Sequence, residues 1–360
     1  MRYPEVTRVR TASVAFKKGI TSNQLFWPLL GLTLLLLFNL FFTNGFFMLE
    51  VKEGHLYGSM IDILNRASVL MLLTIGMTLV IASGGIDISV GSIMAISSSM
   101  VAVLLSGRML TVDGQQQFVS NVPMGIAVLL TLGLAMLFGL MNGLLVSKLG
   151  LQAIVATLIL LVAGRGIAQL ITSGNVITVY NEHFFYLGGG YVFGLPFSIF
   201  IVAAFYLLVM LFIKKTPFGL FLESVGINRV ASRFSGLNVQ VLTIICYVIS
   251  GVCAGMAGIL MTSEVRSSDP NTMGSFIELD AILAFAIAGN SMAGGKFSMT
   301  SSMVGALIIQ TMRTTLYSKG VPPEIMLVVN ALIVIIICSL QSDMVKRFVA
   351  RAHEVKGVPQ

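Results

Sequence analysis

Charged residues are scarce in this chain. They make up 10% of its 360 residues, whereas a soluble domain carries about 25%. A soluble chain of this length must still cover its surface with polar groups, so the composition excludes a soluble fold. The formal net charge is +7, and basic residues gather at the two ends of the chain. Positive-inside membrane topology explains those ends better than nucleic-acid binding does, so we expect no nucleic-acid partner.

Residues that commonly carry chemistry are also few. The three cysteines each lie in an apolar run without a CxxC or metal spacing, so we expect buried free thiols and no metal site. The three histidines are scattered, and neither H-E-x-x-H nor G-x-S-x-G is present. The stretch "GNSMAGGKFS" fails as a phosphate loop, because that spacing needs glycine at Asn290 and Ser or Thr at Phe297. We therefore expect no enzyme, no cofactor and no nucleotide site within the chain.

Long apolar runs make up most of the sequence. Hydrophobic residues make up 56% of the sequence and come in runs of about 20, the length that crosses a hydrocarbon core. A β-barrel would instead alternate over segments of about 10 residues. The sequence predicts an all-α, polytopic transmembrane bundle of about ten spans with broken helices. The expected spans are 25–43, 63–83, 92–106, 123–147, 152–172, 195–213, 241–262, 276–290, 301–317 and 322–341.

The even span count places both termini on one side of the membrane. With the basic ends in the cytoplasm, 15 of the 22 basic residues fall on the cytoplasmic side and four outside, which supports the count. No small-residue cleavage site follows "LLLLFNLFFTNGFF", so the first span is expected to be retained. The expected organisation is a cytoplasmic segment 1–24, a transmembrane domain 25–341 and a cytoplasmic tail 342–360.

The longest cytoplasmic connection, 214–240, reads "KKTPFGLFLESVGINRVASRFSGLNVQ". Pro217 and Gly219 favour a turn, and small and polar residues then follow at helical spacing. Gly236 stands where a helix would end. The pattern predicts one or two short helices outside the bilayer, and the alternative is a solvated loop.

The stretch "SGGIDISVGS" places a carboxylate inside a glycine-rich break between apolar runs. Gly84, Gly85 and Gly91 interrupt the helical pattern around Asp87. Broken helices at membrane depth are tolerated only where protein buries them or where they line a cavity. Asp87 can therefore cap a helix that begins near Ser89, or it can contact a substrate.

Three further charged residues lie within expected spans, where charge is costly and often functional. Arg165 stands between two glycines in "VAGRGIAQLITSGN". An ion pair with an acidic residue on another helix is favoured over a role in lining a polar path. Glu278 and Asp280 open the eighth span and, two residues apart, point to different sides of a helix, so they form no catalytic pair. One of them can pair with a basic residue. The polar outer loop 263–274 carries charges of both signs, and it either binds a soluble partner or is simply solvated.

Four segments resemble a known family in the same order. "MTLVIASGGIDISVGSIMAISS" resembles the glycine-rich signature of permease subunits of ribose-type sugar ATP-binding-cassette (ABC) importers, and "IVATLILLVAGRGIAQLITSG" resembles their fifth span. "ESVGINRVASRFSGLNV" is similar to their cytoplasmic coupling segment, and "ELDAILAFAIAGNSMAGGKFS" to the glycine-rich region that closes their second half. The similarity runs from about 25 to 341. Within the family, "IDILNRASVLMLLTIGMTLVIASGGIDISVG" looks closest to a galactofuranose importer permease.

The sequence departs from the family pattern at two places. Val230 and Ser232 stand where alanines are common, and Lys296 and Phe297 stand where small residues often continue. The resemblance still implies a bacterial inner-membrane permease that works as a homodimer or heterodimer in lipid. It also implies cytoplasmic ATPase subunits that hold ATP and Mg²⁺, and a periplasmic or membrane-anchored sugar-binding protein, for which loop 263–274 is a candidate docking surface.

The resemblance assigns two sets of residues to these roles. The expected translocation-path or helix-break residues are Gly84, Gly85, Asp87, Ser89, Gly91, Arg165, Glu278, Asp280, Gly289, Gly294 and Gly295. The expected ATPase-coupling residues are Glu223, Gly226, Asn228, Ala231, Ser235 and Gly236.

Other classes of membrane protein fit the sequence less well than this function. A secondary transporter driven by an ion gradient also predicts broken helices and midplane carboxylates, but the charges here are few and the coupling-like segment would lack a purpose. A structural or signalling membrane protein has no need for paired glycine breaks. ABC permeases for branched-chain amino acids, nucleosides or autoinducers stay open as substrate classes beside monosaccharides.

Overall fold

The computed structural model describes residues 24–52, 55–112 and 115–322 and a few positions between 325 and 335. The expected terminal segments, apart from residue 24, therefore lie outside the described residues, as does most of the tenth span. Twelve helices are described. They are α2 (Phe26–Phe42), α3 (Ser59–Ala82), α4 (Val90–Leu105), α5 (Met124–Ser147), α6 (Ala153–Thr172), α7 (Glu182–Gly189), α8 (Phe197–Lys215), α9 (Phe218–Ile227), α10 (Arg229–Phe234), α11 (Val239–Val265), α12 (Ile277–Ile287) and α13 (Met299–Ser318).

The helical bundle expected from the apolar runs is confirmed. Each of the first nine expected segments coincides with a helix, and five helices (α3, α5, α6, α8 and α11) are both long and apolar enough to cross a bilayer. The expectation that segment 276–290 crosses the membrane as one helix is wrong, because α12 has only 11 residues. At 1.5 Å per residue such a helix reaches about 16 Å, roughly half of a 30 Å hydrocarbon core.

Four small antiparallel hairpins or ladders depart from a purely helical fold. They pair β1 (Glu50–Lys52) with β2 (His55–Tyr57), β3 (Gly107–Val112) with β4 (Gln115–Ser120), β5 (Ile177–Thr178) with β8 (Ser267–Ser268), and β6 (Tyr191–Val192) with β7 (Leu195–Pro196). Most of these strands are too short to show a readable period. The dipeptide Asp113-Gly114 between β3 and β4 is, however, a hairpin signal in the sequence.

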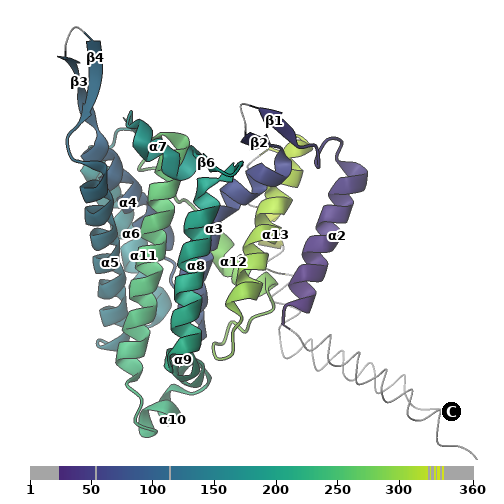
Figure 1. Cartoon of the computed structure of the whole chain (residues 1–360). Coiled ribbons are helices and arrows are strands. Elements are labelled where there is room, and N and C mark those ends of the chain that lie inside the picture. Colours follow the sequence, from purple (N-terminus) through teal and green to yellow (C-terminus); the bar gives the residue numbers. More distant parts are fainter. Residues whose placement is uncertain are drawn as a thin grey trace, which may run out of the picture.

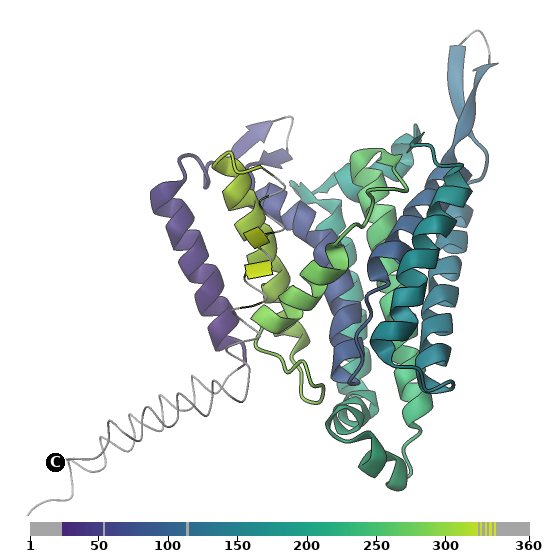
Figure 2. The same ribbon diagram turned by 180° about the vertical axis from the view of Figure 1, so that it is seen from behind.

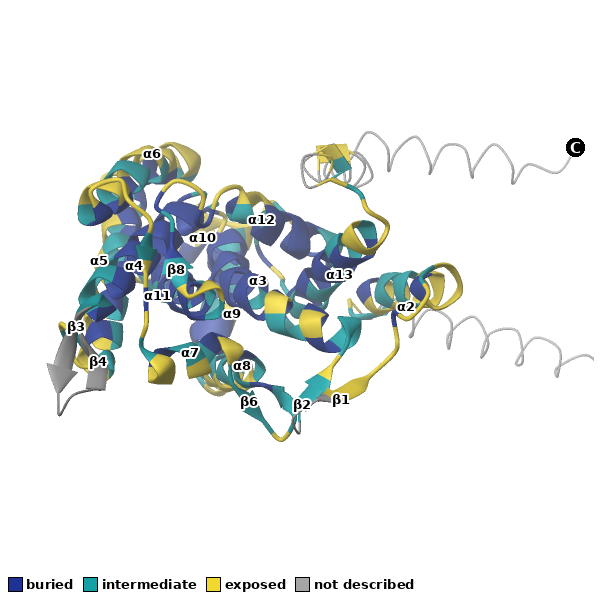
Figure 3. Cartoon of the chain, turned by 90° about the horizontal axis from the view of Figure 1, so that it is seen from above, coloured by how far each residue is buried: buried dark blue, intermediate teal, exposed yellow. Residues whose placement is uncertain are grey.

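Helices α3 and α11 form the centre of the bundle. In their most apolar windows 78% and 61% of the residues are buried, against 22% for α5 and 17% for α8. Helix α11 packs on α3, α4 and α5, while α13 packs on α2, α3 and α12. Figure 3 shows the dark-blue buried core along these central helices and exposed residues on the outer faces. An apolar outer face suits a helix in contact with lipid, since lipid removes the need for polar cover.

The two ends of the bundle differ in kind. The strands β1 to β4 and β6 and the short helix α7 lie at one end, called here the hairpin end (Figure 1). Helices α9 and α10 and the loop after α12 lie at the opposite end, called here the α9–α10 end (Figures 1 and 2). The predicted short helices of segment 214–240 are thus confirmed as two helices.

Candidate functional site

The first helix break opens with a glycine cap. Gly84 has a positive φ of 81°, and its N–H donates to the carbonyl of Ile81 at 2.8 Å. The N–H of Gly85 donates to Val80 O at 3.1 Å, which completes a Schellman motif at the end of α3. The chain then runs without helix to Ser89. Glycine at position 84 is required because other residues rarely adopt this backbone conformation.

Asp87 lies in a closed network of hydrogen bonds. Its carboxylate accepts the N–H and the hydroxyl of Ser89 at 3.0 and 2.6 Å, and the hydroxyl of Ser250 in α11 at 2.9 Å. The amide of Asn142 in α5 donates to Ser89 Oγ at 2.7 Å. Asp87 is fully buried. The expectation that Asp87 caps the next helix is wrong, because Ser89 rather than Asp87 is the N-cap residue of α4 and no described side chain caps the helix. Asp87 binds Ser89 and Ser250 instead, and these contacts favour a structural role over contact with a substrate.

Four glycines that are distant in sequence meet at the α9–α10 end, and we call this contact the glycine junction (Gly84, Gly226, Gly294 and Gly295). A Cβ on Gly226 of α9 would overlap the carbonyl oxygen of Ala82 and the backbone nitrogen of Gly295. A Cβ on Gly294 would lie 3.0 Å from the Cα of Gly84. Only glycine permits this approach of three backbones.

Hydrogen bonds also tie the three segments of the junction together. The N–H of Gly295 donates to Ala82 O, the end of α3, at 3.1 Å. The guanidinium of Arg229, the first residue of α10, donates to Ser83 O at 3.1 Å. A movement of α9 and α10 would therefore act directly on both helix breaks, through the backbone contacts of Gly226 and through the Arg229 side chain.

The expected coupling residues shape α10 and its ends. The side-chain oxygen of Asn228 accepts the N–H groups of Val230 and Ala231, each at 3.0 Å, as an N-cap. Ser235 donates from its hydroxyl to Ala231 O at 3.0 Å. Gly236 has a φ of 84° and ends the helix, as the sequence predicts. These residues define the geometry of α10, and Glu223 lies half-buried on α9.

Large apolar side chains of the α9–α10 pair face outward. Four of them have exposed fractions between 66% and 87%, and such a concentration on two adjoining short helices is typical of a protein interaction site. They are Leu220, Ile227, Val230 and Phe234.

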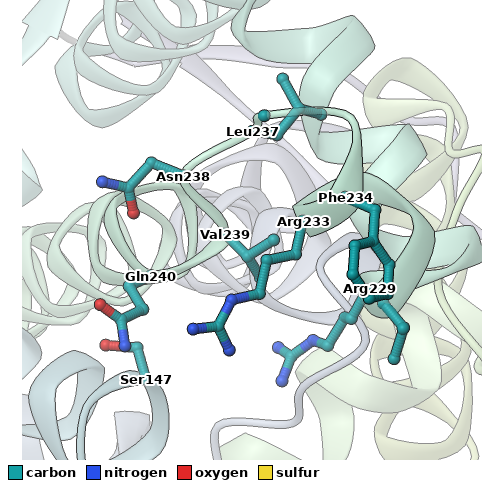
Figure 4. Close-up of a pocket in the computed structure, with 10 residues that line it drawn as sticks. Ser147, Arg229, Arg233, Phe234, Leu237, Asn238, Val239 and Gln240 are labelled. Carbon is teal, nitrogen blue, oxygen red and sulfur yellow. The ribbon is translucent and has the colours of Figure 1, made fainter.

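A basic pocket of about 840 Å³ adjoins this surface. Arg229 and Arg233 project into it, and Ser147 of α5 and Gln240 of α11 border it (Figure 4). The two arginines were not among the expected site residues. Their spacing of four residues in "NRVASRF" places them on one helix face, and that spacing is the signal that could have found them.

The ion pair expected for Arg165 is not present among the described residues, and that expectation is wrong. Within the described part of the chain it has no acidic partner at ion-pair distance; its guanidinium instead donates to the carbonyls of Pro270 and Met273 at 3.3 and 2.5 Å. Gln169, one turn further along α6, donates to Asn271 Oδ1 at 2.8 Å. Carbonyls outside a helix lack helical donors, and the several N–H groups of arginine satisfy them. Arg165 thus holds a loop.

The loop held by Arg165 is neither fully solvated nor wholly outside the bundle. Helix α11 continues to Val265, so the loop spans 266–276 rather than 263–274, and its Pro270 and Met273 are buried. The carboxylate of Asp269 accepts the hydroxyl of Thr272 at 2.7 Å and the N–H of Asn271 at 2.9 Å. These hydrogen bonds lower the pKa of Asp269.

Glu278 and Asp280 point to different neighbours, as their spacing predicts. Asp280 pairs with Arg313 of α13, which confirms that one of the two has a basic partner. Glu278 instead lies against Gly91 in the first turn of α4, where a Cβ would overlap its carboxylate and the carbonyl of Gly274. The two acids therefore join α12 to two different helices.

The second break follows α12. Gly289 ends the helix with a φ of 76°, and its N–H donates to Ala286 O at 3.0 Å. Asn290 then closes the loop: its side chain accepts the N–H of Ser298 at 2.8 Å and donates to Ser302 Oγ at 2.9 Å. Asn290 was missed as a site residue, although it stands inside the "AGNSMAGG" motif.

The expected residues thus gather in separate groups rather than in one cavity. Asp87 and Ser89 share one network, and Gly91 meets Glu278. Gly294 meets Gly84 and Gly226, and Gly295 meets Gly226, whereas Gly85 and Gly289 lie outside this contact. Arg165 lies with the loop 266–276. Across the described ranges no cluster of three or more His, Cys, Asp or Glu residues could hold a metal ion.

The fold is that of a polytopic membrane permease. It has apolar helices around a buried core, two glycine-capped breaks, and a pair of short helices packed on both breaks. The chain belongs to the family described as branched-chain amino acid transport system / permease component, whose model matches residues 59–338. A protein of this family is the permease component of a transport system and is not itself catalytic.

Sugar permeases are among the relatives of the chain. It is 42% identical to the galactofuranose transporter permease protein YtfT of Escherichia coli, over 92% of this chain and 93% of that protein. It is 37% identical to the fructose import permease protein FruF of Bifidobacterium longum, over 95% and 94%. It is 32% identical to the ribose import permease protein RbsC of Escherichia coli, over 77% and 84%. The expected resemblance is confirmed. No solved structure matches the chain.

Proposed function

We propose that this chain is the transmembrane permease subunit of an ABC importer that moves a monosaccharide into a bacterial cytoplasm. The family and the printed functions of the three relatives support this proposal. Among them the galactofuranose permease has the highest identity, so a hexose in furanose form is the first candidate substrate. Fructose and a pentose follow.

The proposed topology has ten crossings with both termini in the cytoplasm. The α9–α10 end is then cytoplasmic and the hairpin end faces outward. The distribution of basic residues supports this orientation. Helix α12 is too short to cross alone, so its crossing includes the irregular stretches on either side of it. Hydrogen bonds of Arg165 and Asn290 hold these stretches, as irregular backbone at membrane depth requires.

Helices α9 and α10 are proposed to contact a cytoplasmic ATPase subunit, which binds ATP and Mg²⁺. Their exposed apolar side chains support a protein partner. The observation that carries the mechanism is the glycine junction, because it packs α9 directly against the end of α3 and the loop after α12. When the ATPase changes shape, different contacts with α9–α10 in its two states would shift both breaks together.

Further partners follow from the same proposal. A periplasmic or membrane-anchored sugar-binding protein would deliver substrate to the hairpin end. A second permease subunit, identical or paralogous, would complete the membrane pore, with lipid around it. The ion-gradient alternative has no comparable support, because Asp87 and Asp280 are already engaged by protein donors.

The test is purification of the intact complex from native membranes in mild detergent, followed by reconstitution into vesicles. Co-purifying ATPase activity and ATP-dependent uptake of radiolabelled galactose, fructose or ribose are expected. Uptake should persist when a protonophore and a sodium ionophore collapse both ion gradients. A chain that purifies without ATPase activity and whose uptake stops with the gradients would overturn the proposal in favour of secondary transport.

A further inference from the structure

A second polar cavity lies at the hairpin end, opposite the glycine junction. Two adjoining hollows of about 430 and 340 Å³ share Arg66 and Tyr317. Their lining residues belong to the first turns of α3, the last turns of α11 and α13 and the start of α12. The volumes are those of small-molecule sites. We call these two hollows together the hairpin-end cavity.

Charges of both signs line or border this cavity and largely balance one another. Arg66 donates from Nε to Asp62 at 2.9 Å, and Arg313, which also lines the cavity, pairs with Asp280. Glu264 of α11 adds a carboxylate to the same lining. A cavity with both strong donors and strong acceptors and little net charge suits a neutral, hydroxyl-rich molecule better than an anion or a cation.

Two polar groups in the lining have unused hydrogen-bonding capacity. Gln310 is only 6% exposed and lines the cavity, and its amide has no hydrogen-bond partner among the described residues. Nε of Arg313 is buried and also lacks a partner within the described part of the chain. Buried polar groups are costly without partners, and a ligand with hydroxyl groups could supply a partner to the Gln310 amide.

The remaining wall is apolar. Val69 and Leu70 of α3, Met261 of α11 and Ile277 of α12 line it, together with the ring of Tyr317. Ligand sites generally combine such apolar walls with a few placed polar groups that fix orientation. The C–H face of a sugar ring fits the apolar side chains, and its hydroxyl groups fit the polar side chains of the same lining.

We infer that the hairpin-end cavity binds the transported monosaccharide after it enters from outside. Gln310 and Arg66 donate to sugar oxygens, Glu264 accepts from sugar hydroxyls, and Tyr317 covers one face of the ring. This inference rests on the proposed function. It adds a binding site that is separate from the two glycine breaks.

Uptake kinetics test the site. Gln310→Leu and Glu264→Gln are compared with Thr311→Val, a control on the same helix whose hydroxyl donates only to Leu307 O of that helix. Initial uptake of radiolabelled galactose, fructose and ribose is measured separately in cells, with equal membrane amounts confirmed by immunoblot. Gln310→Leu and Glu264→Gln should raise the KM of the carried sugar about tenfold or more, since each removes a polar contact to a sugar hydroxyl. Thr311→Val should keep the wild-type KM.

The wild-type and variant results separate the two proposals. If the wild type carries a sugar but both cavity variants keep its KM, the cavity assignment is overturned and the proposed function stands. If the wild type carries none of the three sugars, the sugar function fails and the cavity inference fails with it.

A labelling experiment checks the location independently of transport. Gln310→Cys should react with a membrane-impermeant maleimide added outside intact cells, and the transported sugar should slow the reaction at least threefold. The Gln310→Cys change is made in a Cys338→Ala background, and that background alone is the blank, because Cys246 and Cys253 are buried. Absence of labelling at a normally inserted Gln310→Cys, or labelling that saturating sugar leaves unchanged, would overturn the inference.

Discussion

At the scale of single residues, buried polar side chains hold irregular backbone in place. Asp87 accepts three hydrogen bonds from two segments. In the second break, Asn290 accepts the N–H of Ser298 and donates to Ser302 Oγ. Arg165 satisfies two carbonyls of the loop 266–276. Each of these groups replaces the hydrogen bonds that a continuous helix would have made, which lipid cannot supply.

Replacement of Asp87 tests its structural role. Asp87→Ala leaves the N–H and hydroxyl of Ser89 and the hydroxyl of Ser250 without this acceptor, at about 1–3 kcal/mol for each unsatisfied buried group. Its thermal midpoint in detergent should fall clearly. Asp87→Asn keeps one acceptor oxygen and the same shape, so it should insert normally and melt close to wild type. A stably folded Asp87→Asn that has lost uptake would contradict a purely structural role.

Asp269 predicts a pH dependence for the loop 266–276. Its hydrogen bonds from Thr272 and Asn271 lower its pKa in the folded protein. A lowered pKa means that the stabilisation is present above the unfolded value, about 3.9, and is lost as the pH falls through the folded value. Limited proteolysis of the loop in detergent should therefore show protection at pH 5 to 7 and increased cleavage only below about pH 4.

Thr272→Val supplies the comparison for that titration. It removes the hydroxyl that contributes most to the lowered pKa of Asp269, so the loss of protection should move to higher pH. Identical pH profiles for wild type and Thr272→Val would show that this carboxylate does not govern the loop.

At the scale of elements, α9 and α10 are a rigid pair seated on two breaks. Asn228 caps α10 directly after α9 ends, and Gly226 places α9 against the end of α3 and the loop after α12. Neither contact depends on a long side chain. A displacement of α9 and α10 should therefore displace the end of α3 and the loop after α12, because close-packed backbone has few alternative arrangements.

Gly226→Ala should disturb that transmission. Its Cβ would overlap backbone of Ala82 and Gly295, and overpacking typically costs about 1–3 kcal/mol. Sugar uptake per ATP hydrolysed should fall about tenfold in reconstituted vesicles, since 1.4 kcal/mol is a tenfold change in an equilibrium.

The matched control for this substitution is Gly166→Ala in α6. A Cβ there meets no atom within 4 Å, and alanine is favoured over glycine inside a helix, so uptake per ATP should equal that of wild type. Equal uptake per ATP in Gly226→Ala and Gly166→Ala would remove the glycine junction from the coupling mechanism.

At the scale of the whole molecule, two chemically different ends are joined by α3. This helix begins beside the hairpin-end cavity with Arg66 and ends at the glycine junction with Ala82. It is also the most buried of the spanning helices. A shift of the Ala82 end of α3 would also displace the part of α3 that lines the hairpin-end cavity, because a packed helix moves as a unit.

Cysteine labelling tests the proposed orientation of these ends. Phe193, in the β6–β7 turn at the hairpin end, is 93% exposed, and Ser235 is exposed at the end of α10. An impermeant maleimide should label Phe193→Cys in intact cells, and Ser235→Cys only after the membrane is opened. The reverse pattern would invert the topology, and labelling of both in intact cells would place the ends on the same side.

Local features of the sequence predicted much of the fold. Run length and apolarity predicted the helices, and Gly84, Gly236 and Gly289 predicted helix ends through their backbone freedom. The same local signals overlooked the two-residue ladders, which have no period. They also overstated α12, because the expected segment ran to 290 whereas the helix ends at Ile287.

The sequence by itself therefore determined that the chain is a helical membrane protein with two glycine breaks and a short-helix segment, because these depend on neighbouring residues. Only the tertiary structure decided that Gly226 meets both breaks, that Arg165 binds carbonyls instead of an acid, and that Gln310 faces a cavity with Arg66 and Glu264. The partners in these contacts lie tens to hundreds of residues apart, and packing of the whole bundle alone sets which of the many polar and small residues come together.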